Sequence, residues 1–154
     1  MSPTATPDFE ARTRDSFSRQ AAMATLGIQL VQVAPGAVAL SLQHRPDLTQ
    51  QHGFLHAGIV STALDSACGY AAFTLMPADA AVLTIEFKVN LLAPARGPQL
   101  RIEGQVVKAG RTISVVDARA WQPPADGAPA GTPDTLVATM TATVMTVLGR
   151  GLAG

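Results

Sequence analysis

The spacing of apolar and polar residues predicts one long buried helix between two groups of strands. From Gln50 to Leu75, apolar residues recur every three or four positions, which is typical of a helix packed in a core. These residues are Ile59, Val60, Ala63, Leu64, Ala67, Cys68, Ala71, Ala72 and Leu75. We therefore expect the other elements to pack around this helix.

Short extended patterns predict strands on both sides of the helix, two before it and four after it. They cover residues 28–34, 37–43, 82–90, 100–108, 112–121 and 136–148. The alternation is complete in 82–90, where Leu83, Ile85, Phe87 and Val89 are expected on a buried face, opposite Val82, Thr84, Glu86, Lys88 and Asn90. Residues 8–26 have a looser helical pattern, which begins after Asp8 and stops at Gly27.

This order contains no alternation of single strands and helices, so it favours an α+β fold with an antiparallel sheet wrapped around the long helix. We expect one domain over residues 8–148, after a disordered lead (1–7) and before a flexible tail (149–154). The outer face and edges of such a sheet stay exposed, which favours oligomerisation.

Composition narrows the function classes. The chain has 154 residues, 47% of them apolar, which suits a single folded domain. Eleven basic and eleven acidic residues cancel and only 5% of the residues are aromatic, so the composition does not resemble that of a nucleic-acid-binding protein. The first residues hold no apolar core of a signal peptide, and no long uncharged apolar run follows. We expect a soluble, cytoplasmic protein.

Metal chemistry is not expected from the cysteine and histidine pattern. The single cysteine, Cys68, excludes an intramolecular disulfide, and its place on the apolar helix face indicates a small buried hydrophobe. His44, His52 and His56 lack the paired spacing of metal ligands. We therefore predict no metal and no cofactor.

One carboxylate interrupts the helix. Asp65 belongs to a stripe of small or polar residues that also contains Gly58, Ser61, Thr62 and Gly69. The lack of large side chains lets a ligand or another backbone come close to the carboxylate. A helix carboxylate needs hydrogen-bond partners to offset desolvation, so it serves either chemistry or a tie to a strand or a partner chain.

The turn before the helix is the second candidate. Gly53 and Gly58 flank His56, and the first free N–H groups of the helix point out near residues 55–58. The positive end of the helix dipole makes this a site for a carbonyl oxygen or a phosphate. His56 and Asp65 lie nine residues apart and project from opposite sides, so they cannot form a dyad within one helix.

These residues carry a family resemblance. The segment Gly53-Phe54-Leu55-His56-Ala57-Gly58, followed by Leu64-Asp65-Ser66-Ala67, resembles the G-x-x-H-G-G-x(5)-L-x-D motif of hotdog-fold acyl-CoA thioesterases of the phenylacetic acid degradation type. The strand 84–90 leading into residues 92–95, and the segment 108–112, also fit this family in the right order.

The resemblance implies hydrolysis of an aryl-acetyl, aromatic or medium-chain acyl-CoA, in a homo-oligomer (a dimer or a dimer of dimers, hence a homotetramer) whose active site lies at the subunit interface. Asp65 of one subunit would act as nucleophile or general base. The Ala57 amide of the other subunit would polarise the thioester carbonyl, and Gln50 would position water or substrate. The family has glycine where this chain has Ala57, so an added methyl narrows the space there.

Several further residues have two readings. His56 either orients the turn or takes part in the chemistry, and Gln50 is either a site residue or a solvated loop amide. Substrate contacts are expected from Gly58, Ser61, Thr84, Asn90, Lys108 and Arg111. Lys108 and Arg111 flank a hairpin and could contact the phosphates of coenzyme A, although exposed hairpin cations usually contact only water. Thr84 could equally be an ordinary strand threonine.

Two other functions stay open. A non-catalytic acyl-CoA-binding module on the same fold is made more plausible by Ala57. A hotdog dehydratase acting on hydroxyacyl thioesters shares the fold, but such enzymes place a catalytic histidine opposite an acid, and the motif around His56 does not resemble theirs.

Overall fold

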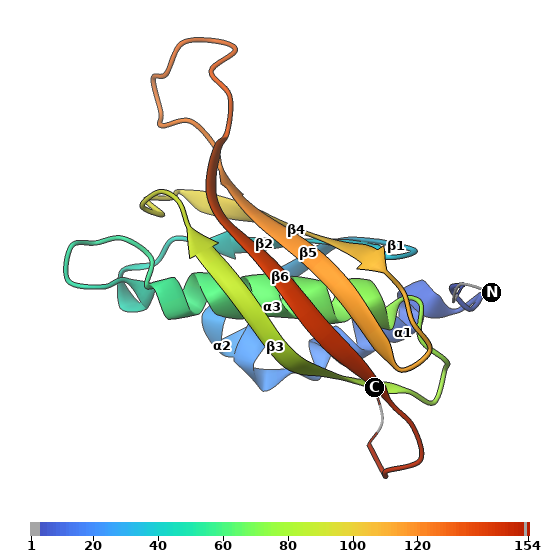
Figure 1. Cartoon of the computed structure of the whole chain (residues 1–154). Coiled ribbons are helices and arrows are strands. Elements are labelled where there is room, and N and C mark those ends of the chain that lie inside the picture. The colour runs from blue at the N-terminus through green and yellow to red at the C-terminus, as the bar shows by residue number, and fades with distance from the viewer. Residues whose placement is uncertain (1–3, 153) are drawn as a thin grey trace.

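A six-stranded antiparallel sheet curves around one long helix, α3 (Ala57–Phe73), as the sequence predicts (Figure 1). The computed structural model describes residues 4–152 and 154. The strand order is β1-β2-β4-β5-β6-β3. The strands are β1 (Gln29–Ala34), β2 (Ala37–Gln43), β3 (Ala81–Leu91), β4 (Gln99–Lys108), β5 (Ile113–Gln122) and β6 (Thr135–Val147).

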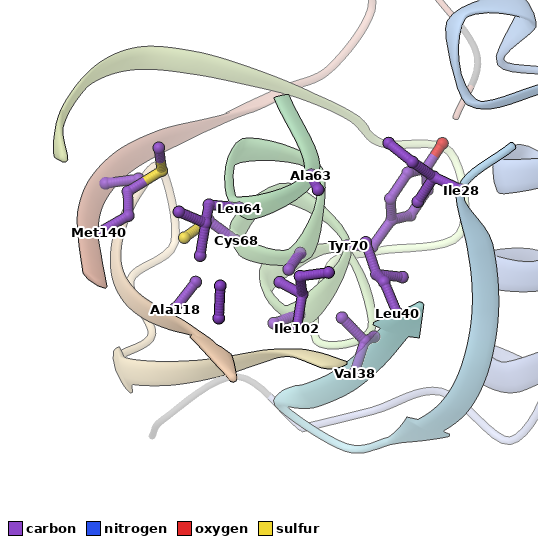
Figure 2. Packing of buried hydrophobic residues seen from close by; sticks show 14 of the residues in the cluster. Ile28, Val38, Leu40, Ala63, Leu64, Cys68, Tyr70, Ile102, Ala118 and Met140 are labelled. Atoms are coloured by element: carbon purple, nitrogen blue, oxygen red, sulfur yellow. The ribbon is translucent and has the colours of Figure 1, made fainter. Parts of the chain in front are cut away.

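The core lies between α3 and the concave face of the sheet. Figure 2 shows Leu64 and Cys68 of α3 pointing toward Ala118 and Met140 of the sheet, all of them buried. Gly104 of β4 allows the closest approach, because a Cβ added there would lie 2.4 Å from the carbonyl oxygen of Ala67. The predicted apolar face of the helix is therefore confirmed as the centre of the core.

The N-terminal helical region is broken in two, where the sequence predicts one segment. Helix α1 (Phe9–Ser18) ends before Arg19, and α2 (Ala21–Leu26) ends, as predicted, at Gly27 with φ +70°.

Helix α1 is tied to the segment that follows α3. The guanidinium of Arg12 donates to the carbonyl oxygens of Met76 (2.8 Å) and Pro77 (2.7 Å). A short 3-10 helix, Pro46–Leu48, precedes the turn into α3. None of the helices in the described part of the chain is long and apolar enough to span a bilayer.

The predicted alternation along β3 is wrong beyond Thr84, because a bulge lies between Thr84 and Glu86. Thr84 pairs with buried Val144 and faces the helix, whereas Glu86 pairs with Thr143 on the outer face. The bulge thus reverses the pattern, so that Lys88 and Asn90 also lie on the outer face.

The expected buried face of β3 is also wrong. Leu83, Ile85 and Phe87 are 48%, 53% and 44% exposed. The reason is that β3 is an edge strand, which among the described residues pairs with no strand other than β6, and α3 leaves most of it uncovered. The edge strand therefore leaves a row of exposed apolar side chains and backbone groups.

A strap of residues 92–98, between β3 and β4, closes over the turn that precedes α3. The N–H of Leu55 donates to the carbonyl oxygen of Ala95 at 2.9 Å. From β5, the side-chain oxygen of Gln122 accepts the N–H groups of Arg96 (2.5 Å) and Gly97 (3.0 Å). These bonds hold the strap beside the N-terminus of α3.

Candidate active site at the two ends of a helix stripe

His56 is the N-cap of α3. Its backbone is extended, and its Nδ1 accepts the N–H of Gly58 at 2.9 Å. The same turn is held by His44, whose Nε2 lies 2.8 Å from the carbonyl oxygen of Gly53. Of the two roles considered for His56, this geometry favours the orienting one, because the ring nitrogen that faces the helix already serves the cap.

The cap leaves one N–H open at the helix end. The N–H groups of Ile59 and Val60 both donate to the carbonyl oxygen of His56, and that of Gly58 goes to the ring. Across residues 4–152 and 154, the N–H of Ala57 has no acceptor in the chain. Ala57 is exposed, so an unused donor at the positive end of α3 is available to a ligand oxygen.

This donor lies on the wall of an apolar pocket of about 360 Å³ between the turn and the strap. The pocket is lined by Gln50, Phe54, Leu55, Ala57, Val60, Leu91, Leu92, Ala93, Pro94, Ala95 and Val137. Gln50 is the one polar side chain in that set. Its carbonyl oxygen accepts the N–H of His52, so its amide NH₂ remains as the donor for a ligand.

Asp65 lies further along the stripe, half-buried. The hydroxyl of Thr84 donates to its Oδ1 at 2.8 Å, across from β3. No donor within the described ranges reaches Oδ2. The carboxylate is thus held by one oxygen while the other stays open, which suits a nucleophile or a general base. From the sequence, Thr84 could be either a substrate contact or an ordinary strand threonine, because the bulge that turns it inward leaves no signal in the pattern.

The Ala57 amide and Asp65 of one chain are too far apart to act on the same carbonyl. Eight residues of helix separate them by about 12 Å, whereas a reacting carbonyl must lie about 3 Å from both groups. They also open into different hollows. Asp65 lines a smaller one, of about 270 Å³, with polar neighbours that include Gln20, Ser66 and Thr84.

The other predicted substrate contacts fall into two groups. Gly58 and Ser61 lie on the exposed side of the first turn of α3, and the Ser61 hydroxyl donates to the carbonyl oxygen of Ala57 at 2.8 Å. Asn90 lies on the outer face, where it donates to Thr139 at 3.2 Å and accepts from Lys88 at 2.6 Å. The structure does not bring Asn90 to the pocket, because the bulge turns it outward.

Lys108 and Arg111 lie at the opposite end of α3. Arg111 lines a cavity of about 710 Å³ together with Leu75 and Met76, just beyond the C-terminus of the helix. The 17 residues of α3 span about 25 Å. Within one chain, these cations are therefore remote from the Ala57 amide.

The remaining candidate groups are inert in this arrangement. Burial raises the pKa of the Cys68 thiol, and the charges of Asp65 and Asp117 raise it further, so the thiol stays protonated. In the part of the chain that the structure describes, no three His, Cys, Asp or Glu side chains gather as a metal site would require.

Comparison with known proteins supplies the family context. The sequence profile of the thioesterase superfamily matches residues 52–126. A crystal structure of a thioesterase family protein from Silicibacter pomeroyi is 53% identical, with a TM-score of 0.85, over 92% of this chain and 99% of that one.

Two further matches are more distant. An esterase candidate from Saccharolobus solfataricus is 33% identical over 60% of this chain, a match that spans 65% of that protein, just under two thirds. The PaaI protein of the Escherichia coli phenylacetic acid degradation operon shares the fold, with a TM-score of 0.78 over 92% of this chain and 95% of that one, at 16% identity.

Proposed function

The chain belongs to the thioesterase superfamily and has its hotdog fold, and from this premise we propose that it hydrolyses an acyl-CoA thioester to a free acid and coenzyme A. The observation that carries the proposal is a pair of open groups on one helix, α3. They are the unused N–H of Ala57 beside an apolar pocket, and the Asp65 carboxylate with one oxygen free.

The chemistry follows from these two groups. The thioester carbonyl oxygen accepts the Ala57 N–H, and the negative charge that develops on it is stabilised at the positive end of α3. In one route Asp65 takes a proton from water, whose oxygen attacks the carbonyl carbon. In the other route a carboxylate oxygen attacks directly, and water then cleaves the resulting anhydride. In both routes the C–S bond breaks and coenzyme A leaves as the thiol.

The separation of about 12 Å along α3 implies that two chains share the site. The exposed edge of β3 offers the means, because it carries free backbone groups and exposed apolar side chains. We infer that two copies pair along this edge, related by a two-fold axis.

The contacts of β3 suggest where the axis passes. Thr84 of β3 bonds to Asp65 and therefore lies beside that part of α3, whereas Leu91 of β3 lines the pocket and therefore lies beside Ala57. Thr84 and Asn90 each lie three residues from Phe87. A two-fold axis near Phe87 therefore places Thr84 of one chain opposite Asn90 of the other. Asp65 of one chain then comes level with the pocket of the other.

The same axis gives Lys108 and Arg111 a role. It turns the C-terminal half of one α3 toward the strap of the other chain, so that these cations approach the neighbouring pocket rather than their own. There they would contact the phosphates of coenzyme A.

The Ala57 methyl leaves the backbone N–H in place, so the oxyanion contact is retained.

A panel assay tests the activity. Thiol release is followed with phenylacetyl-, hydroxybenzoyl- and straight-chain acyl-CoA substrates, and we expect release from at least one. Absence of release from every substrate, with binding still detectable, would instead favour the acyl-CoA-binding module. Reverting Ala57→Gly would then show whether the methyl blocks turnover.

Subunit mixing tests the shared site. Asp65→Asn and Gln50→Ala subunits, each inactive alone, are unfolded together and refolded. If the two residues come from different chains, statistical mixing of a two-fold dimer restores about a quarter of the wild-type activity, because each mixed dimer holds one intact site. Proven mixing without recovery would show that both residues act within one chain.

A further inference from the structure

We propose that the pocket beside Ala57 holds the acyl group, and that the buried valines at its floor, Val60 and Val137, limit the length of acyl chain that the protein accepts. This inference rests on the proposed thioesterase function and adds to it the residues that decide the substrate. The acyl group enters past the rim formed by Leu91 and Leu92.

The burial of the lining residues separates rim from floor. Leu91 and Leu92 are 54% and 56% exposed, whereas Val60 and Val137 are 3% and 1% exposed. The two valines come from α3 and β6, which form opposite walls of the core. A chain that passes the rim therefore ends against side chains that cannot move aside without disturbing the core.

The position of the pocket matches the geometry of a bound thioester. The carbonyl carbon of an acyl-CoA carries the acyl chain on one side and the sulfur on the other. With the carbonyl oxygen on the Ala57 N–H, an apolar space that begins at Ala57 is available to the acyl chain. Gln50, at the same mouth, is the one polar side chain of the pocket lining, and it is placed to meet the reacting end.

Two of the other hollows are chemically less suitable. The hollow at Asp65 is lined mainly by polar groups, among them Gln20, Ser66 and the Tyr70 hydroxyl, which lies 3.3 Å from that of Ser16. A depression of about 460 Å³ along β1, β2, β4 and β5 carries Glu103, Asp117 and Arg119. An alkyl or aryl group buried in either would desolvate polar groups without bonding them.

The volume indicates the class of acyl group. About 360 Å³ lies at the lower end of the range of roughly 300–1,000 Å³ for small-molecule pockets. A single aromatic ring on a short linker or a medium-length alkyl chain suits this volume, whereas a long fatty acyl chain does not. The Phe54 side wall is held from outside by Arg96, whose guanidinium carbon lies 4.7 Å from the ring centroid.

The experiment compares floor variants with a buried control. We measure kcat/KM for acyl-CoA substrates from acetyl to dodecanoyl, and for phenylacetyl-CoA, in wild type, Val137→Ala, Val137→Leu and Val116→Ala. Val116 is as buried as Val137 but lines none of the described pockets, so its variant reports only general loss of packing. Val137→Ala should move the optimum to longer chains and Val137→Leu to shorter ones, each by about tenfold in the ratio of neighbouring substrates. Val116→Ala should leave the ratios unchanged.

Two outcomes overturn the inference. One is an active enzyme whose chain-length ratios stay the same in both Val137 variants, and the other is an equal shift in Val116→Ala. If Val137→Ala fails to fold, Leu92→Ala at the exposed rim takes its place, and it should relax the preference for narrow acyl groups.

A second measurement separates this inference from the proposed function. Methyl NMR of the wild-type protein is recorded during titration with octanoate and with phenylacetate. Shifts of the Val60 and Val137 methyl signals support the pocket even if no thioester is hydrolysed. Binding that leaves both signals unmoved contradicts the pocket even if hydrolysis is found.

Discussion

The substitution Asp65→Asn tests the proposed catalytic group with little change to the fold. In the structure, the Thr84 hydroxyl lies 2.8 Å from Oδ1 of Asp65. Asparagine has the same shape as aspartate and keeps an oxygen that can accept this hydrogen bond. Because Asp65 is half-buried and makes no ion pair in the described part of the chain, we expect the free energy of unfolding to change by less than about 1 kcal/mol.

The effect on turnover should be much larger. The amide can neither accept the proton of water nor attack as a carboxylate. Removing a general base of this kind lowers the rate by about 100- to 10,000-fold, or roughly 3–5 kcal/mol in transition-state free energy. Binding should be retained, because the Ala57 amide and the apolar pocket are untouched.

The chain offers a matched control in Asp117. It is half-buried, and its carboxylate accepts the Thr141 hydroxyl at 2.7 Å, but it lies on the outer face of the sheet. Asp117→Asn repeats the same chemical change outside the site. The assay is thiol release at saturating and limiting substrate, with urea denaturation and calorimetric binding of each variant.

The reasoning is refuted if Asp65→Asn retains wild-type turnover, or if Asp117→Asn loses as much. Loss of activity together with loss of folding in Asp65→Asn would also contradict it, because the carboxylate would then be needed for structure.

The other predictions concern the Thr84 hydrogen bond, the close approach of Gly104 to α3 and the buried thiol of Cys68. Thr84→Val removes the hydrogen-bond donor to Asp65 while keeping the side-chain shape, and should lower kcat about tenfold with KM little changed. Thr84→Ser keeps the hydroxyl and should have a kcat close to that of the wild type. An unchanged kcat in Thr84→Val would show that the hydrogen bond does not contribute to turnover. Gly104→Ala forces the new Cβ against the Ala67 carbonyl oxygen and should lower the free energy of unfolding by about 1–3 kcal/mol, measured from the denaturant midpoint. An unchanged midpoint would mean that α3 and β4 can move apart to make room for the methyl group without loss of stability. Burial raises the pKa of Cys68, so the folded protein should resist disulfide reagents at neutral pH and react on unfolding. The pKa of Cys68 is higher in the folded than in the unfolded state. Its contribution to the free energy of unfolding is therefore complete below the pKa of the unfolded state and is lost as the pH rises from there toward the folded pKa. The free energy of unfolding of Cys68→Ala should accordingly fall less at alkaline pH than that of the wild type.

Local patterns were sufficient to predict much of this protein. The apolar spacing of residues 59–75 predicted the core helix, and turn residues such as Pro35-Gly36 and Gly27 predicted where strands and helices end. These signals depend only on residues within a few positions of one another, because a buried helix or a tight turn has the same local residue pattern in any fold. The position of Asp65 on a small-residue stripe was also visible in this way, whereas the cytoplasmic location stays a prediction.

Contacts between distant segments could not be predicted in the same manner. The bulge in β3 depends on its pairing with β6, and it decides that Thr84 meets Asp65 while Asn90 faces away. Burial of β3 could not be read from its alternation either, since an edge strand has the same pattern as a covered one.

The pocket beside Ala57 was likewise invisible in the sequence. Its walls come from the turn before α3, the first turn of α3, the end of β3, the strap and β6. The strap is held by Gln122, a residue of β5 with no motif around it. Periodicity determines which face of an element is apolar. Only the tertiary structure determines which faces meet, because strand register and connecting loops set those contacts over long sequence separations.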